Sequence, residues 1–176
     1  MNWKGCLLPL ALPLSVLVIG SWRLAVSDRS PAPQPALFQS SQYQGPDYTQ
    51  APPGTYPTCQ QDPALADLLL AEGRRLGIKV RAGQPELPGK DATYRAESGR
   101  LGTITIKQRL MSPLVRCMLI SHEFIHVLQH LHGELRGVPP LGWTNEHPDP
   151  IPQEAEAYGH QHRVGYVLSL LRATPR

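Results

Sequence analysis

The sequence predicts an α+β domain over residues 59–176, and three observations support this prediction. Leu114 to Leu131 has the length and the apolar periodicity of a buried helix. Thr103 to Ile106 alternates polar and apolar residues with period two, as a half-buried strand does. The stretch before residue 59 has almost no aliphatic periodicity, so the folded part begins after it. A chain of 176 residues has room for one such domain with a modest core.

Residues 1–27 are predicted to be a signal peptide or a membrane anchor. Lys4 precedes an uncharged run from Gly5 to Trp22, and Ala25-Val26-Ser27 offers a small-residue cleavage site. A run of about 18 apolar residues lies between a signal peptide and the shortest spanning helix in length, so both alternatives stay open. In either case we expect an extracytoplasmic protein that is secreted, periplasmic or membrane-anchored.

Residues 28–58 are predicted to be a disordered linker between this segment and the domain. They are rich in proline, glutamine and serine, and such a composition buries too little apolar surface to offset the entropy of ordering. Cys59 and Cys117 both follow the export segment, and in an exported protein such a pair can form a disulfide. A free, buried Cys117 is the alternative, and the sequence leaves both open.

Capping residues and periodicity predict the elements of the domain in order. Asp62-Pro63 and Ser112-Pro113 each pair an N-cap residue with a proline at the first helical position, and Gly77 and Gly133 close the two helices. The predicted elements are a helix over Ala64 to Leu76, a strand at Ile78 to Val80, a hairpin of Ala92 to Glu97 with Gly102 to Lys107, a helix over Leu114 to Leu131, and a C-terminal helix over Ile151 to Leu171.

The long predicted helix carries the motif His122-Glu123-Phe124-Ile125-His126. At about 3.6 residues per turn, the two histidines stack on one face and can both reach one zinc ion. Glu123 lies roughly 100° round the helix from His122, so it can address a metal-bound water instead of the metal. This motif supplies a hydrolytic centre that lacks one ligand.

A third histidine within the same stretch does not complete the centre. His132 has the spacing of the last histidine in HExxHxxGxxH, but that pattern needs a glycine where this chain has Gln129. Without a break in the helix, His132 points roughly 120° away from His126. No methionine follows Met118, so the Met-turn of that pattern is missing as well. We therefore reject His132 as a ligand.

A glutamate on the C-terminal helix is the second route to a third ligand. The apolar stripe of that helix runs through Val164, Val167, Leu168 and Leu171. Projected back along the helix, it places two glutamates at similar angles on opposite sides of its centre. Helical geometry alone barely separates Glu154 from Glu156.

A His-Glu-x-x-His helix, a loop and a helix with a Glu-Ala pair together resemble the gluzincin branch of the zinc metallopeptidases. In many of these the ligand glutamate directly precedes an alanine. Glu156-Ala157-Tyr158 fits that pattern and Glu154-Ala155-Glu156 fits almost as well; we favour Glu156, partly because His160 faces the same way one turn on. The resemblance covers Ser112 to about His162. It implies a minimal zincin-like domain in which an edge strand, here Gly102 to Lys107, pairs with an extended peptide.

The resemblance and the residue types imply a zinc-dependent metallopeptidase that acts on a protein or peptide. Zinc held by His122, His126 and Glu156 lowers the pKa of its water towards about 7, and Glu123 acts as general base. The candidates for a donor to the developing oxyanion are Tyr158, His160, His162 and Tyr166. The net charge of +3 is mild and unclustered, so no nucleic-acid partner is predicted.

A non-catalytic module on the same scaffold is the alternative to an enzyme. Such a binding or regulatory module would use zinc only to stabilise its fold. Glu123 favours the enzyme, because a structural zinc site has no use for it and closes its fourth position with a protein ligand. The substrate stays open, and hydrolysis of cell-wall peptide instead of protein fits the residues equally well.

Overall fold

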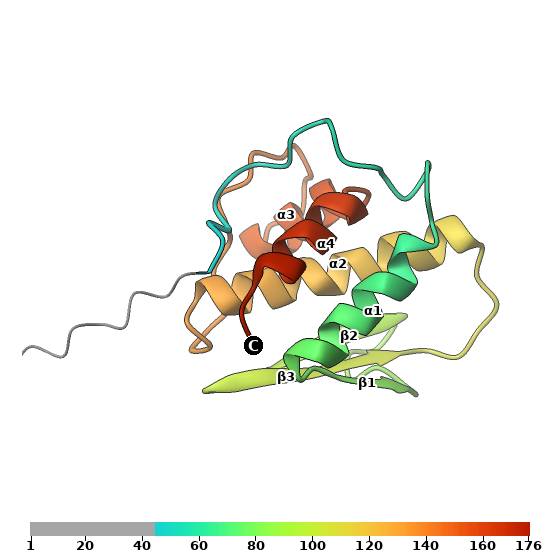
Figure 1. Cartoon of the computed structure of the whole chain (residues 1–176). Helices are drawn as coiled ribbons and strands as arrows, with labels where there is room; N and C mark the ends of the chain where they lie inside the picture. Colours follow the sequence, from blue (N-terminus) through green and yellow to red (C-terminus); the bar gives the residue numbers. More distant parts are fainter. Residues whose placement is uncertain (1–44) are drawn as a thin grey trace, which may run out of the picture. The chain divides into compact units, whose positions relative to one another are not determined.

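The computed structural model of the chain describes residues 45–176, so the predictions for the export segment and for most of the linker lie outside the described residues. The described part is an α+β domain, as predicted, in which helices pack on a small sheet (Figure 1). Its elements are α1 (Leu65–Leu76), β1 (Lys79–Ala82), β2 (Ala92–Glu97), β3 (Arg100–Ile106), α2 (Pro113–His132), α3 (Pro152–His160) and α4 (Val164–Ala173).

The sheet has the strand order β1-β3-β2, with β1 parallel and β2 antiparallel to β3. The predicted hairpin is confirmed, and Gly99, with a φ of 76°, supplies the left-handed residue of its turn. The predicted place of Gly102 to Lys107 at the edge of the sheet is wrong, because β3 lies in the middle between two partners. Within the described part, β2 and β1 are the two edge strands.

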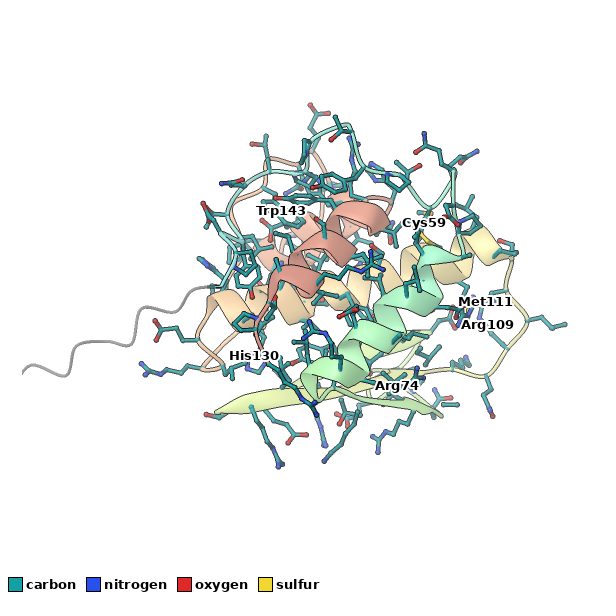
Figure 2. The ribbon with its side chains drawn as sticks, in the orientation of Figure 1. Cys59, Arg74, Arg109, Met111, His130 and Trp143 are labelled. Carbon is teal, nitrogen blue, oxygen red and sulfur yellow. A yellow bond between two sulfur atoms is a disulfide. The ribbon has the colours of Figure 1, made fainter. Side chains whose placement is uncertain are left out.

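Helix α2 lies between the sheet and the two C-terminal helices (Figure 1). The Ser112 side chain accepts a hydrogen bond from the backbone N–H of Val115, so the predicted N-cap is confirmed. A disulfide joins Cys59 to Cys117 near the start of this helix, across a sequence separation of 58 residues (Figure 2). Of the two alternatives that the sequence left open, the structure therefore has the disulfide.

The predicted single helix over Ile151 to Leu171 is wrong, because the chain breaks between α3 and α4. A segment from before α1 binds at this break: Cys59 donates its backbone N–H to the carbonyl of His162, and Gly165 donates to the carbonyl of Pro57. A Cβ on Gly165 would come within 2.7 Å of that carbonyl oxygen, so the close approach requires glycine. The apolar stripe of α4 therefore cannot be projected back onto α3.

Residues 45–58, predicted as the end of the linker, instead pack on the domain. Tyr48 is buried, and its backbone carbonyl accepts a hydrogen bond of 2.9 Å from the indole N–H of Trp143. Tyr166 donates its hydroxyl to the backbone carbonyl of Gln50 at 2.8 Å. These aromatic contacts supply the burial that the proline-rich composition alone does not predict. No helix within residues 45–176 is both long and apolar enough to cross a membrane.

Candidate metal centre

His122 and His126 face the same side of α2, as their spacing predicts. Their Nε2 atoms lie 3.1 Å apart, and both side chains are buried. The rings meet edge to face, with centroids 4.8 Å apart. Because the two residues are one helical turn apart, the backbone of α2 brings both side chains to the same place.

The carboxylate of Glu154, in the first turn of α3, completes the group. Its Oε1 lies 3.2 Å from Nε2 of His126, and its Oε2 lies 3.6 Å from Nε2 of His122. The imidazoles of His122 and then of His126, whose Nε2 atoms face the carboxyl group, hold the pKa of Glu154 well below its usual range, so this side chain is a carboxylate. The three residues form a group whose ligand atoms all lie within 4.8 Å of one another and that could hold a metal ion.

The separations within this group fit a tetrahedral metal ion. Two ligand atoms that each lie about 2.0 Å from such an ion are about 3.3 Å apart. The two Nε2 atoms are 3.1 Å apart, close to that value, and each of them lies 3.2 or 3.6 Å from a different oxygen of the Glu154 carboxylate. The Oε2 atom of Glu154 is buried without a hydrogen-bond partner in the described structure, and the Lys90 ammonium lies 3.6 Å from it as an ion-pair partner. The donor set of two imidazoles and one carboxylate is therefore suited to a metal.

Glu156, favoured by sequence as the third ligand, is not brought to the two histidines. Its carboxylate accepts four hydrogen bonds of 2.8 Å, from the side-chain amide of Gln129 and from the backbone N–H groups of Leu141, Gly142 and Trp143. Glu156 is only 1% exposed, whereas the side chain of Glu154 is 24% exposed and borders a cleft. Of the two glutamates, the structure thus places Glu154 where an ion could be held.

Glu123 lies in the wall of the same cleft as the three residues of this group. Burial raises the pKa of its carboxyl to about 7, while His126 and a hydrogen bond from the backbone N–H of Tyr94 act in the opposite direction. A carboxyl group with such a pKa can exchange protons near neutral pH, as a general base must. The structure thus brings Glu123 to the same cleft as the two histidines and Glu154.

The cleft has a volume of about 240 Å³ and runs between α2, α3 and the edge strand β2. Ala92, Thr93 and Tyr94 of β2 form one wall. Lys90, just before β2, is a cleft residue that the sequence analysis missed. Lys90 donates a hydrogen bond of 2.8 Å to the hydroxyl of Tyr158. This bond raises the pKa of Lys90, so the Lys90 side chain stays protonated. Its sequence neighbours, Gly89 and Asp91, give no signal of this position, because only the tertiary fold creates it.

Among the other residues considered, Tyr158 alone lines this cleft, and its ring packs 4.4 Å from that of His122. His132 is exposed, in agreement with its rejection as a ligand. His160 interacts through Nε2 with the backbone carbonyl of Thr144 at 3.0 Å. His162 and Tyr166 are not among the residues that line the cleft.

Comparisons of the chain with protein-family models, with curated proteins and with solved structures give no match. The indications of function therefore come from its own side chains.

Proposed function

We propose that this protein is a zinc-dependent metallopeptidase built on a minimal zincin-like domain. The observation that carries the proposal is one arrangement: His122, His126 and Glu154 converge at a cleft that Glu123 also lines. Two histidines and one carboxylate form a ligand set typical of catalytic zinc, which keeps one position open. When bound, zinc supplies a Lewis acid and lowers the pKa of water in that open position.

Glu123 is the general base of the proposed reaction. It accepts a proton at its carboxylate from the water that attacks the peptide carbonyl, and it passes that proton to the leaving amine. Its raised pKa of about 7 belongs to the metal-free protein, and a cation nearby favours the ionised form that accepts the proton. Lys90 and Tyr158 also line the cleft and are donors suited to a developing oxyanion.

The edge strand β2 is the segment suited to hold an extended peptide. In the described sheet it pairs with β3 only, so its other edge is open to hydrogen bonds except at the backbone N–H of Tyr94, which donates to Glu123. Three of its residues also line the cleft. A substrate paired with β2 would have its backbone beside Glu123 and the histidines, which favours peptides over small molecules.

A purely structural zinc site is the alternative, and two observations disfavour it. The group within residues 45–176 has three ligands, whereas structural sites usually close the fourth position with a protein ligand. Glu123 is buried in the cleft wall, and burial raises the pKa of its carboxyl group to about 7. Burying this carboxyl group costs stability, and a structural zinc site has no use for it. The disulfide supports the further proposal that the protein works outside the cytoplasm.

The test combines zinc analysis with cleavage of a peptide library. The wild-type protein should bind about one zinc per chain and cleave members of the library. Glu123→Gln should bind the same amount of zinc and lose roughly 100- to 10,000-fold in kcat, since removal of a general base costs that much.

Glu97→Gln is the matched control, because Glu97 is a carboxylate at the far end of β2 from Lys90 and lies outside the cleft lining. It should cleave the library like the wild type. A folded wild-type protein that binds no zinc, or a Glu123→Gln variant with unchanged turnover, would contradict the proposal.

A further inference from the structure

Glu156 is a buried carboxylate with an unusual set of partners, and its role goes beyond the proposed function. Its Oε1 accepts from the backbone N–H groups of Gly142 and Trp143. Its Oε2 accepts from the backbone N–H of Leu141 and from the side-chain amide of Gln129. Three of these four donors belong to the backbone of a loop between α2 and α3, so the carboxylate has a fixed position.

The side chain of Gln129 has only one orientation that satisfies its surroundings. Its Nε2 donates to Oε2 of Glu156 at 2.8 Å and to the backbone carbonyl of Gln153 at 3.0 Å. Both of these groups can only accept, so the NH₂ end of the amide must face them. The Oε1 end therefore faces Nδ1 of His126, at 2.8 Å.

This orientation fixes the protonation of the His126 ring. An amide oxygen only accepts hydrogen bonds, so Nδ1 of His126 must carry a proton and donate it. In the neutral ring the lone pair is then on Nε2, the atom that lies 3.2 Å from Glu154. We propose that Gln129 and Glu156 are positioning residues, which hold His126 in the tautomer and ring orientation that binds the metal.

The second histidine provides an internal comparison. The Nδ1 atom of His122 is buried and has no hydrogen-bond partner in the described structure. The chain of hydrogen bonds through Glu156 and Gln129 therefore acts on His126 and not on His122. This inference rests on the proposed metal site, but the tautomer of His126 can be measured in the metal-free protein.

Glu156→Gln is the most discriminating variant, because it leaves Gln129 and His126 unchanged. The new amide places its oxygen towards the N–H groups of Gly142 and Trp143, so its NH₂ group faces the N–H of Leu141 and the NH₂ group of Gln129. The NH₂ group of Gln129 then meets a donor at residue 156 and an acceptor at the carbonyl of Gln153, so neither orientation of this amide satisfies both neighbours and its Oε1 is no longer held towards Nδ1 of His126. We expect the neutral, metal-free His126 ring to shift from the Nδ1–H towards the Nε2–H tautomer, read from its ¹⁵N chemical shifts in the full chain. We also expect zinc affinity, measured by chelator competition, to fall roughly 10- to 100-fold.

Two further variants separate positioning from a general loss of structure. Gln129→Met removes the acceptor and should lower zinc affinity by a similar factor. Gln153→Met is the control, since only the backbone carbonyl of Gln153 takes part, and it should bind zinc like the wild type.

The outcomes distinguish this inference from the proposed function. Wild-type protein that binds no zinc contradicts the metal site itself. Wild-type protein that binds zinc, with unchanged affinity and an unchanged His126 tautomer in Glu156→Gln, contradicts only the positioning role. A Gln129→Met variant that keeps the zinc affinity of the wild type would also contradict it, provided that this variant gives the circular dichroism and melting transition of a folded protein.

Discussion

Glu154 and Glu156 are two residues apart on α3, yet their carboxylates have different partners. Glu154 faces two histidines across the cleft, and Glu156 accepts four N–H donors in the interior. The sequence could restrict the third ligand to these two but could not choose between them. The choice depends on the loop N–H groups at Leu141 to Trp143, and nothing in the sequence of that loop shows which carboxylate it binds.

The residues of the motif itself were the most predictable part of the site. His122, Glu123 and His126 lie on one helix, so their relative positions follow from helical geometry alone. Lys90 was missed and Glu154 was ranked second, because both reach the cleft through contacts between elements far apart in the chain. Local geometry is thus readable from sequence here, and the arrangement between elements is not.

His130 is a buried histidine whose titration should affect stability. It is 1% exposed, and its Nδ1 lies 2.8 Å from the hydroxyl of Tyr94 (Figure 2). Burial lowers its pKa below the ordinary value of 6.5, so the unfolded chain takes up a proton at a higher pH than the folded protein does. The stabilisation from neutral His130 is therefore complete above that ordinary value and is lost as the pH falls below it.

The measurement is the free energy of unfolding of wild type and His130→Gln, both with chelator, between about pH 7.5 and pH 5.5. The wild type should lose its advantage over the variant as the pH falls, by at most about 1.4 kcal/mol per pH unit. Other titrating groups act equally in both proteins and cancel in the difference. A difference that stays constant, or that grows towards acid pH, would contradict this role of His130.

At the scale of elements, the break between α3 and α4 limited the sequence prediction most. The residues of the break, Gln161 to Arg163, include neither proline nor glycine, and their composition permits a continuous helix. The break arises because the segment Pro57 to Cys59 binds there through backbone hydrogen bonds. By contrast, the bounds of α1 and α2 were predicted to within one or two residues, although the predicted N-cap at Asp62 is wrong because the N-cap residue of α1 is Ala64.

Helices α1 and α2 approach each other closely at Gly73, which gives a prediction for the packing of elements. A Cβ on Gly73 would lie 2.6 Å from Cζ of Phe124, whose side chain is fully buried. Alanine should gain about 1 kcal/mol of helix propensity at this position, whereas overpacking costs about 1–3 kcal/mol. We expect a net loss of roughly 1 kcal/mol for Gly73→Ala in chemical denaturation.

Gly137→Ala is the control for that substitution, because a Cβ there meets no atom within 4 Å. Its effect should stay within about 0.5 kcal/mol. A Gly73→Ala protein that is more stable than the wild type would show that the two helices do not approach as closely as described.

For the whole molecule, one disulfide and one folded-back segment hold the layers together around the candidate centre. The disulfide connects Cys59, before α1, to Cys117, five residues before His122 on α2. The segment at residues 45–58 packs on Trp143 and α4, whereas its composition predicts a disordered linker. The fold class could be predicted from sequence because periodicity and capping are local, whereas this covering segment depends on a few aromatic side chains within a polar stretch.

The position of zinc in crystals of the zinc-loaded protein tests the central claim most directly. Anomalous X-ray scattering at the zinc edge locates the ion without assumptions about its ligands. We predict one site per chain, with Nε2 of His122, Nε2 of His126 and the carboxylate of Glu154 each about 2.0–2.2 Å from the ion and Glu123 outside the ligand set. Zinc bound by Glu156, or the absence of zinc between the two histidines, would contradict the account.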